Sequence, residues 1–120
     1  MPTSELTVAG IIEAREVNVS VSAGAGPDYV FASGYRLPSL KETRDYIRQF
    51  NHLPDVPPAL KMEKEGINLS EMNMLLLKKI EELTLYAIEQ NNKTEELAKL
   101  LKIQQEEIDE LEKMIKTKEL

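Results

Sequence analysis

Apolar residues spaced alternately four and three apart run through the C-terminal two-fifths of the chain. A period of 3.5 residues keeps one face of a helix turned toward a supercoiling partner, so the repeat predicts a coiled coil. With Ile80 at heptad position a, this face (the seam) consists of Leu76, Ile80, Leu83, Ala87, Gln90, Thr94, Leu97, Leu101, Gln104, Ile108, Leu111 and Ile115. A helix from about Ser70 to Lys116 would be roughly 70 Å long. The other residues are too few to cover that length, so we expect copies of the chain to bury the seam against one another.

The seam carries two opposing indications of how many chains associate. Ile at a with Leu at d, as at Ile80 and Leu83, favours a parallel dimer. Several flanking e and g positions, where a dimer usually carries charges, are instead apolar: Leu77, Tyr86, Ala98, Leu100 and Met114. A wider apolar face suits three strands, or packing by another element. We therefore expect a parallel homotrimer, with a dimer as the alternative.

Gln90, Thr94 and Gln104 place polar groups on the predicted axis. Such groups lower stability but penalise slipped registers. Because Gln90 and Thr94 occupy adjacent layers, we interpret them as register determinants. The alternative is that a long rod merely tolerates them.

The sequence divides into three regions. Residues 1–26 are predicted to be a β-rich fibre-shaft end, because Val17, Val19 and Val21 alternate with polar residues, and this region closes with a flexible break at 22–27. Residues 27–69 are predicted to form a small α+β clamp region that begins with a second extended run, PDYVF. Residues 70–120 are the rod. The expected fold class is thus mainly α with a short β entry, ending in a long parallel coiled coil.

The clamp region contains one strong helix signal. Ser39 as N-cap and Glu42 three residues later form a capping box, which predicts a helix beginning at Leu40. Its apolar face contains Leu40, Thr43, Tyr46, Ile47 and Phe50. We expect this helix to cover the first half of the rod, where Leu85 and Ile88 are apolar but lie outside the seam.

Prolines, a glycine and a serine predict where helices end and begin before the rod. Pro54, Pro57 and Pro58 exclude helix and predict an extended crossover. Residues 61–66 are expected to form a short helical turn that ends at Gly66. Ser70 is expected to cap the long helix.

Composition argues against several classes of function. The net charge of −6 is spread along the chain, whereas a nucleic-acid binder needs a concentrated basic face. There is no Cys, and the one His, His52, cannot supply a metal site alone. No run of about 18 apolar residues predicts a membrane span. The carboxylates of the rod lie on a convex helix rather than in a pocket. We therefore expect no enzyme activity, cofactor, metal or nucleic acid.

Four segments in order, PDYVF, LPSLKETRDYI, NHLPDVP and GINLSEMNMLLLKKIEELTLYAIEQN, resemble a known family. The chain from about Leu6 to Asn91 is similar to the C-terminal segment of phage tail-fibre-like and surface-fibre proteins from Bacteroidetes bacteria. The resemblance implies a trimeric fibre end in a virion or an extracellular fibre-like particle. It extends to the intramolecular chaperones of tail spikes, but the Ser-Asp and Lys signature of their self-cleavage is absent, so cleavage is not carried over.

The residues and the resemblance together predict a non-enzymatic module that collects and aligns the chains of a fibre. The alternative is a fibre tip that binds a cell-surface receptor or glycan through the aromatic residues Tyr29, Phe31, Tyr35 and Tyr46. Buried aromatic rings would favour a clamp, and exposed rings would favour a binding surface.

Overall fold

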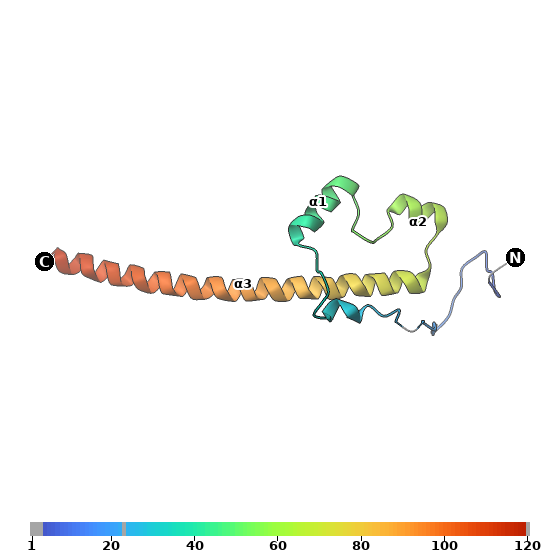
Figure 1. The fold of residues 1–120 in the computed structure, drawn as a ribbon, viewed down its shortest axis with the longest axis horizontal. Coiled ribbons are helices and arrows are strands. Elements are labelled where there is room, and N and C mark those ends of the chain that lie inside the picture. The colour runs from blue at the N-terminus through green and yellow to red at the C-terminus, as the bar shows by residue number, and fades with distance from the viewer. Residues whose placement is uncertain (1–3, 23, 120) are drawn as a thin grey trace.

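The computed structural model describes residues 4–22 and 24–119. It contains a 3-10 helix, η1 (Asp28–Phe31), and three α-helices, α1 (Leu40–Phe50), α2 (Ala59–Glu65) and α3 (Leu69–Lys118) (Figure 1). The outermost residues of the first and last predicted regions, 1–3 and 120, lie outside the described residues, as does residue 23 in the expected flexible break.

Helix α3 determines the shape of the molecule. It has 50 residues, and the chain measures 94 × 32 × 30 Å along its principal axes. The radius of gyration is 25.4 Å, against about 14 Å for a compact domain of this length. The expectation of a mainly helical chain with one long extended helix is confirmed.

The start of α3 differs slightly from the prediction. Asn68, not Ser70, is the N-cap residue, and its extended backbone lets Met72 N–H donate to its carbonyl at 2.9 Å. The Asn68 side chain donates to Glu71 Oε2 at 3.1 Å rather than capping a backbone N–H. The prediction of a Ser70 cap is wrong because the chain enters the helix two residues earlier.

Helix α1 begins where the sequence predicts, whereas α2 begins at Ala59, two residues before the expected turn, because Pro58 is itself accommodated as its N-cap. Ser39 Oγ accepts from Glu42 N–H at 3.1 Å, and Glu42 Oε2 accepts from Ser39 N–H at 3.4 Å, which completes the predicted capping box. Helix α1 ends where Asn51 adopts a left-handed conformation with φ 59°. Gly66, with φ 74°, ends α2 as expected.

The two predicted extended runs are corrected by the structure. No strand forms within residues 4–22 and 24–119, so the β entry is absent from the single chain. A strand needs a neighbour to pair its backbone N–H and C=O groups, and here residues 17–21 lie instead beside the first turns of α3. The run PDYVF forms η1, because Val30 N–H donates to Pro27 O and Ala32 N–H to Tyr29 O, each at 3.0 Å.

The chain wraps α3 from two sides. Figure 1 shows η1 on one side of α3, a crossing segment, and then α1 and α2 in an arc on the other side. Among the described helices, η1 is the one that packs against α3, and Val30 of η1 is 2% exposed. The backbone of α1 does not approach α3 closely, and the two helices meet only through side chains such as Thr43 and Tyr86. The expectation that α1 covers the first half of the rod stays a prediction.

Candidate functional site

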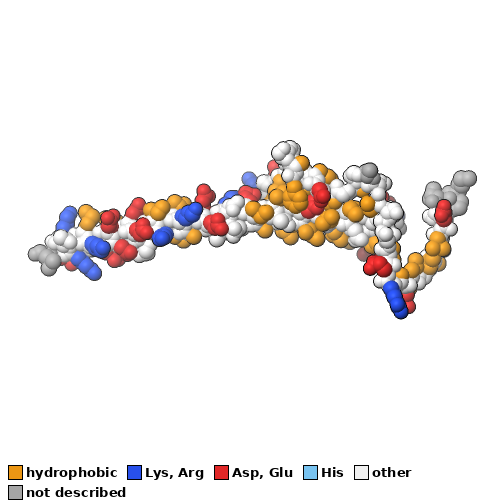
Figure 2. All heavy atoms as spheres, turned by 90° about the horizontal axis from the view of Figure 1, so that it is seen from below, with side chains coloured by type: hydrophobic (Ala, Val, Ile, Leu, Met, Phe, Trp, Pro, Cys, Tyr) orange, Lys and Arg blue, Asp and Glu red, His pale blue; other side chains and the backbone are white. Residues whose placement is uncertain are grey.

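The predicted seam is uncovered along its whole length in the single chain. All of its positions are exposed: Leu76, Ile80, Leu83, Ala87, Gln90, Thr94, Leu97, Leu101, Gln104, Ile108, Leu111 and Ile115. Figure 2 shows hydrophobic side chains distributed along the rod among charged ones, and gathered over its thicker part. A single chain therefore cannot bury the face that its heptad repeat creates.

The exposed surface is large for a chain of this mass. It amounts to 11115 Å², against about 6,600 Å² for a compact 13.6 kDa protein by the usual size scaling. The difference, roughly 4,500 Å², is more than one chain contributes to an obligate dimer interface of about 5,000 Å² in total. The single chain therefore leaves a large area, including the apolar seam, exposed to solvent.

The polar layer at Thr94 is less costly than its residue type suggests. The Thr94 hydroxyl donates to the carbonyl oxygen of Gln90 at 2.9 Å, within the same helix. Its hydrogen-bonding need is therefore met within the helix, and its methyl group remains available for packing. The Gln90 amide makes no such bond, so Gln90 carries the larger burial cost of the two layers.

The back of the first half of α3 is covered by η1 and the segment after it. Glu82, 6% exposed, accepts a hydrogen bond from the Tyr35 hydroxyl at 3.0 Å. Its other oxygen lies 3.1 Å from Lys79 Nζ, an ion pair without the alignment of a hydrogen bond. Burial, followed by this bond to Glu82, raises the pKa of Tyr35. These contacts attach η1 to the b, c and f side of the helix, opposite the seam.

A second carboxylate under η1 is less well accommodated. Glu81 is 7% exposed, and its Oε2 atom has no hydrogen-bond partner. Burial raises the pKa of Glu81, and the nearby Asp28 side chain raises it further. The charged form of Glu81 therefore opposes the docking of η1, whereas the protonated form favours it.

The crossover between α1 and α2 is attached to α3 by a pair of lysines. Asp55 Oδ2 lies 3.2 Å from Lys78 Nζ and 3.6 Å from Lys79 Nζ. The hydrogen bond from Lys78 lowers the pKa of Asp55. Burial alone would lower the pKa of Lys78, but the hydrogen bond and the charge of Asp55, together with the nearby Tyr29 and Tyr35, outweigh burial and raise it. Lys78 Nζ also lies 5.9 Å from the centre of the Tyr29 ring. One lysine thus touches both segments that flank the helix.

The four aromatic residues proposed as a clamp or binding surface do not form one patch. Tyr29 and Tyr35 lie together beside α3, with ring centres 5.8 Å apart. Tyr46 lies on α1 against Phe50, at 4.5 Å, and against His52, at 5.4 Å. Tyr29 and Phe31 are exposed, whereas Tyr35 and Tyr46 are half-buried. Three of the aromatic residues therefore belong to the segment beside α3, and Tyr46 belongs to a separate cluster at the end of α1.

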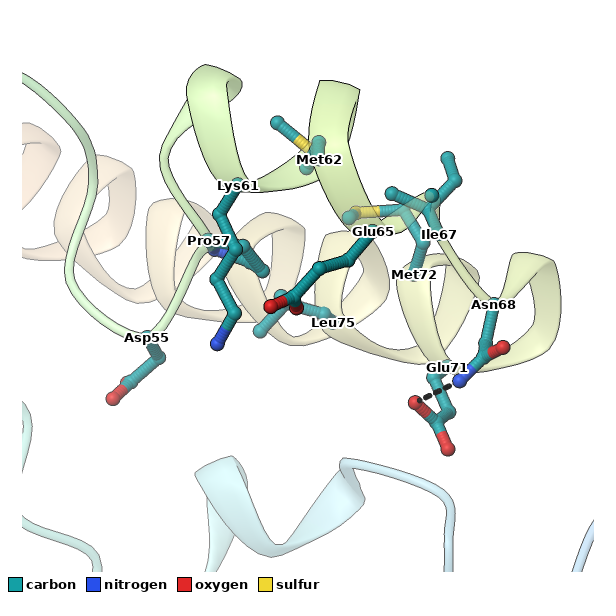
Figure 3. Close-up of a pocket in the computed structure, with 11 residues that line it drawn as sticks. Asp55, Pro57, Lys61, Met62, Glu65, Ile67, Asn68, Glu71, Met72 and Leu75 are labelled. Atoms are coloured by element: carbon teal, nitrogen blue, oxygen red, sulfur yellow. Dashed lines mark hydrogen bonds between the residues drawn. The ribbon is translucent and has the colours of Figure 1, made fainter.

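Of the hollows that separate the arc of α1 and α2 from α3, two bear on how the arc packs. The first, 250 Å³, is lined mainly by apolar side chains and lies beside the seam: Pro38, Leu40, Thr43, Leu53, Pro54, Asp55, Lys79, Glu82, Leu83 and Tyr86. The other, 210 Å³, lies between α2 and the first turns of α3, with Met62, Ile67, Met72 and Leu75 in its wall (Figure 3). These hollows were not predicted, because sequence periodicity does not report how far a loop stands from a helix.

The remaining features of the described part of the chain concern metal ligands, its one His and membrane-spanning helices. Within residues 4–22 and 24–119, no group of three or more His, Cys, Asp or Glu side chains is placed to hold a metal ion. His52 Nδ1 lies 2.9 Å from the carbonyl oxygen of Leu53, in the turn after α1. None of the described helices is long and apolar enough to cross a membrane.

Comparison with known proteins adds no relative: no family model matches the chain, and neither a curated protein nor a solved structure matches it significantly. The resemblance to fibre proteins therefore stays a prediction, and the candidate site is defined by geometry alone.

Proposed function

We infer that this protein is a non-enzymatic oligomerisation module that gathers parallel copies of a fibre-like chain through α3. The observation that carries the inference is the exposed seam, which repeats over the length of α3 and finds no cover in its own chain. Burying apolar surface at about 25 cal/mol per Å² provides the driving force for such an assembly.

Three chains are favoured over two by the flanks of the seam. Leu77 and Leu100, at e and g positions, are exposed in the single chain and would stay largely exposed in a dimer. A third helix covers these flanks. Light scattering over a range of concentrations should give three times the 13.6 kDa chain mass. A mass of two chains would exclude the trimer, and a mass of one chain would exclude the module itself.

The proposed role of the assembly is registration. Val17, Val19 and Val21 all line one hollow beside the first turns of α3, so parallel helices would bring three copies of this segment together at one end. Strand pairing between separate chains is slow and prone to slippage, and prior alignment removes both difficulties. The polar layers at Gln90 and Thr94 would discourage alignments displaced by a heptad.

Registration can be tested by disulfide crosslinking, because the chain has no native Cys. Single cysteines at Val19 on different chains should crosslink, whereas mixed chains carrying Val19→Cys and Ser22→Cys should not. Three residues of extended chain span about 10 Å, the displacement that a slip of one heptad would cause in the helices. The double variant Gln90→Leu/Thr94→Ile should melt at a higher temperature and begin to give the offset product. Equal yields of matched and offset products in the unaltered seam would refute registration.

A second candidate, a receptor- or glycan-binding tip, is favoured by one observation. Tyr29 and Phe31 are 50% and 54% exposed on η1, and exposed aromatic rings are common in binding surfaces. If this candidate is correct, Phe31→Ala should abolish binding in a glycan or cell-surface screen while leaving the assembled mass unchanged. Hits that persist in the variant would place the binding elsewhere.

A further inference from the structure

The segment from Pro38 to Ile67, here called the arm, contains α1, the crossover and α2. We propose that the arm of each chain packs onto α3 of a neighbouring copy, so that the chains of the assembly clasp one another. This inference rests on the proposed function, since it requires a second copy, and it adds the surface by which the copies interlock outside the seam.

Helix α1 lacks the packing that a helix of its length requires. It has 11 residues, and isolated helices shorter than about 12–15 residues are marginal in water. Its apolar face is partly open: Thr43 and Tyr46 are half-buried, whereas Ile47 is 40% and Phe50 49% exposed. Because the backbone of α1 does not approach its own α3 closely, the open part of this face has to be covered from elsewhere.

The arm is nevertheless held at defined points on its own α3. The Tyr86 hydroxyl donates to the carbonyl oxygen of Pro38 at one end. Asp55 forms ion pairs with Lys78 and Lys79 nearer the other end. Between these attachments lies the 250 Å³ hollow, whose wall is shared by α1, Leu53, Leu83 and Tyr86. The arm is thus hinged on the side of α3 that carries Lys79 and Tyr86, both at heptad position g.

The heptad repeat identifies what lies opposite this hinge. In a parallel coiled coil, the g edge of one helix lies beside the e edge of the next. The e edge of this chain carries Leu77 and Thr84, with Ile88 one turn beyond Thr84 on the same side. Leu77 is 40% exposed and Ile88 is 53% exposed, and neither belongs to the seam. The apolar face of α1 and these residues are therefore two uncovered surfaces that association brings together.

The hollow has the size and lining for such a partner. A cavity of about 150 Å³ holds one benzene-sized group, so 250 Å³ accommodates one or two large apolar side chains. The hollow includes Leu83 of the seam, which makes it continuous with the surface that the helices share. A second copy is thus the occupant that reaches it without any further element.

The test is a single tryptophan in the full chain, which has none of its own. In Ile47→Trp, the emission should be blue-shifted and protected from iodide in the assembly. Adding Leu111→Asp, which lies about 42 Å along the helix from Leu83, should dissociate the chains and remove both effects. Phe50→Trp repeats the measurement should Ile47→Trp misfold, and Leu60→Trp, on an 80% exposed side chain, is the matched control that should stay red-shifted throughout.

Each other outcome overturns the proposal in a distinguishable way. Red-shifted, quenchable emission in the assembly would mean that the arm is free. Blue-shifted emission that survives dissociation would mean that the arm folds onto its own helix. A single-chain mass by light scattering on the same unaltered protein would instead remove the proposed function, and the clasp with it.

A crosslink identifies the neighbour directly. Chains carrying only Ile47→Cys, mixed with size-tagged chains carrying only Ile88→Cys, should give a mixed disulfide. The matched pair Ile47→Cys with Ile103→Cys, about 22 Å further along α3, should give none. Equal yields from the two pairs, or none from either, would exclude packing of α1 on the Ile88 side of a neighbour.

Discussion

Leu97→Ala tests the seam most sharply, because the structure supplies a matched control in Ile103. Both residues are large, aliphatic and on α3, and in the single chain they are 58% and 50% exposed. They differ in heptad position: Leu97 lies at d, in the seam, and Ile103 lies at c, on the outer face. A single helix in water would respond almost equally to the two substitutions, whereas a coiled coil would not.

The expected magnitudes follow from that difference. Truncating a packed Leu to Ala costs about 2–5 kcal/mol, and a trimer contains the change three times, which gives about 6–15 kcal/mol per assembly. At 1.4 kcal/mol per tenfold, even the lower figure lowers the association constant by about four powers of ten. Ile103→Ala should change stability by less than about 0.5 kcal/mol. The better helix propensity of Ala offsets part of the lost contact there.

The assay is thermal unfolding by circular dichroism over a range of concentrations, with the mass measured on the same samples. Leu97→Ala should melt earlier, with a midpoint that depends more steeply on concentration, and should dissociate on dilution. Ile103→Ala should follow the unaltered chain. If the two variants melt together, whether both fall or neither does, the heptad assignment is wrong and the seam is not the buried face.

Three further predictions concern the contacts around the first half of α3. Burial and the Asp28 side chain raise the pKa of Glu81, so the folded chain gains stability as the pH falls from neutral to about pH 4.3 and loses it again as the pH rises through that pKa. Glu81→Gln should remove this dependence of the melting temperature on pH. A variant whose melting temperature varies with pH as in the unaltered chain would contradict the assignment to Glu81. Asp55, whose pKa the hydrogen bond from Lys78 lowers, stabilises the crossover at neutral pH and loses its effect in acid. Asp55→Asn should therefore speed amide exchange in the crossover. The free energy of local opening should fall by less than about 1 kcal/mol, because the carboxylate is exposed, and slower exchange in the variant would refute the role of Asp55. Ser39→Ala removes a cap worth about 1 kcal/mol, so amide exchange within α1 should accelerate about fivefold, with α3 as the unaffected internal reference.

The elements that the sequence predicts well are those specified by neighbouring residues. The capping box at Ser39 and the stop at Gly66 depend on contacts within a few residues, and both form as expected. The 3.5-residue repeat likewise predicts the existence of α3, because helix periodicity is a local property. Each of these signals is complete within a short window of the chain.

The elements that the sequence predicts poorly depend on what lies beside them. The run PDYVF has strand-forming residues, but with no neighbouring strand it turns into η1 and buries Val30 against α3. The valines at 17–21 alternate as predicted, yet form no strand in the single chain for the same reason. From the sequence, the buried pair Glu81 and Glu82 cannot be distinguished from solvent-facing carboxylates, because nothing local marks the helix face that η1 covers.

The contacts proposed for the seam and for the arm differ in the free-energy cost that each has to offset. Bringing separate chains together costs about 4–15 kcal/mol, and the repeated layers of the seam can supply this because each copy contributes several large side chains. Once the helices are together, the arm meets its neighbour at an effective concentration of the order of millimolar, as for groups on short tethers. The arm contact can therefore be largely formed within the assembly even though it is too weak to bring free chains together. Substitutions in the seam should therefore change the assembled mass, whereas Ile47→Asp in the arm should leave the mass unaltered and expose only the surface that α1 covers.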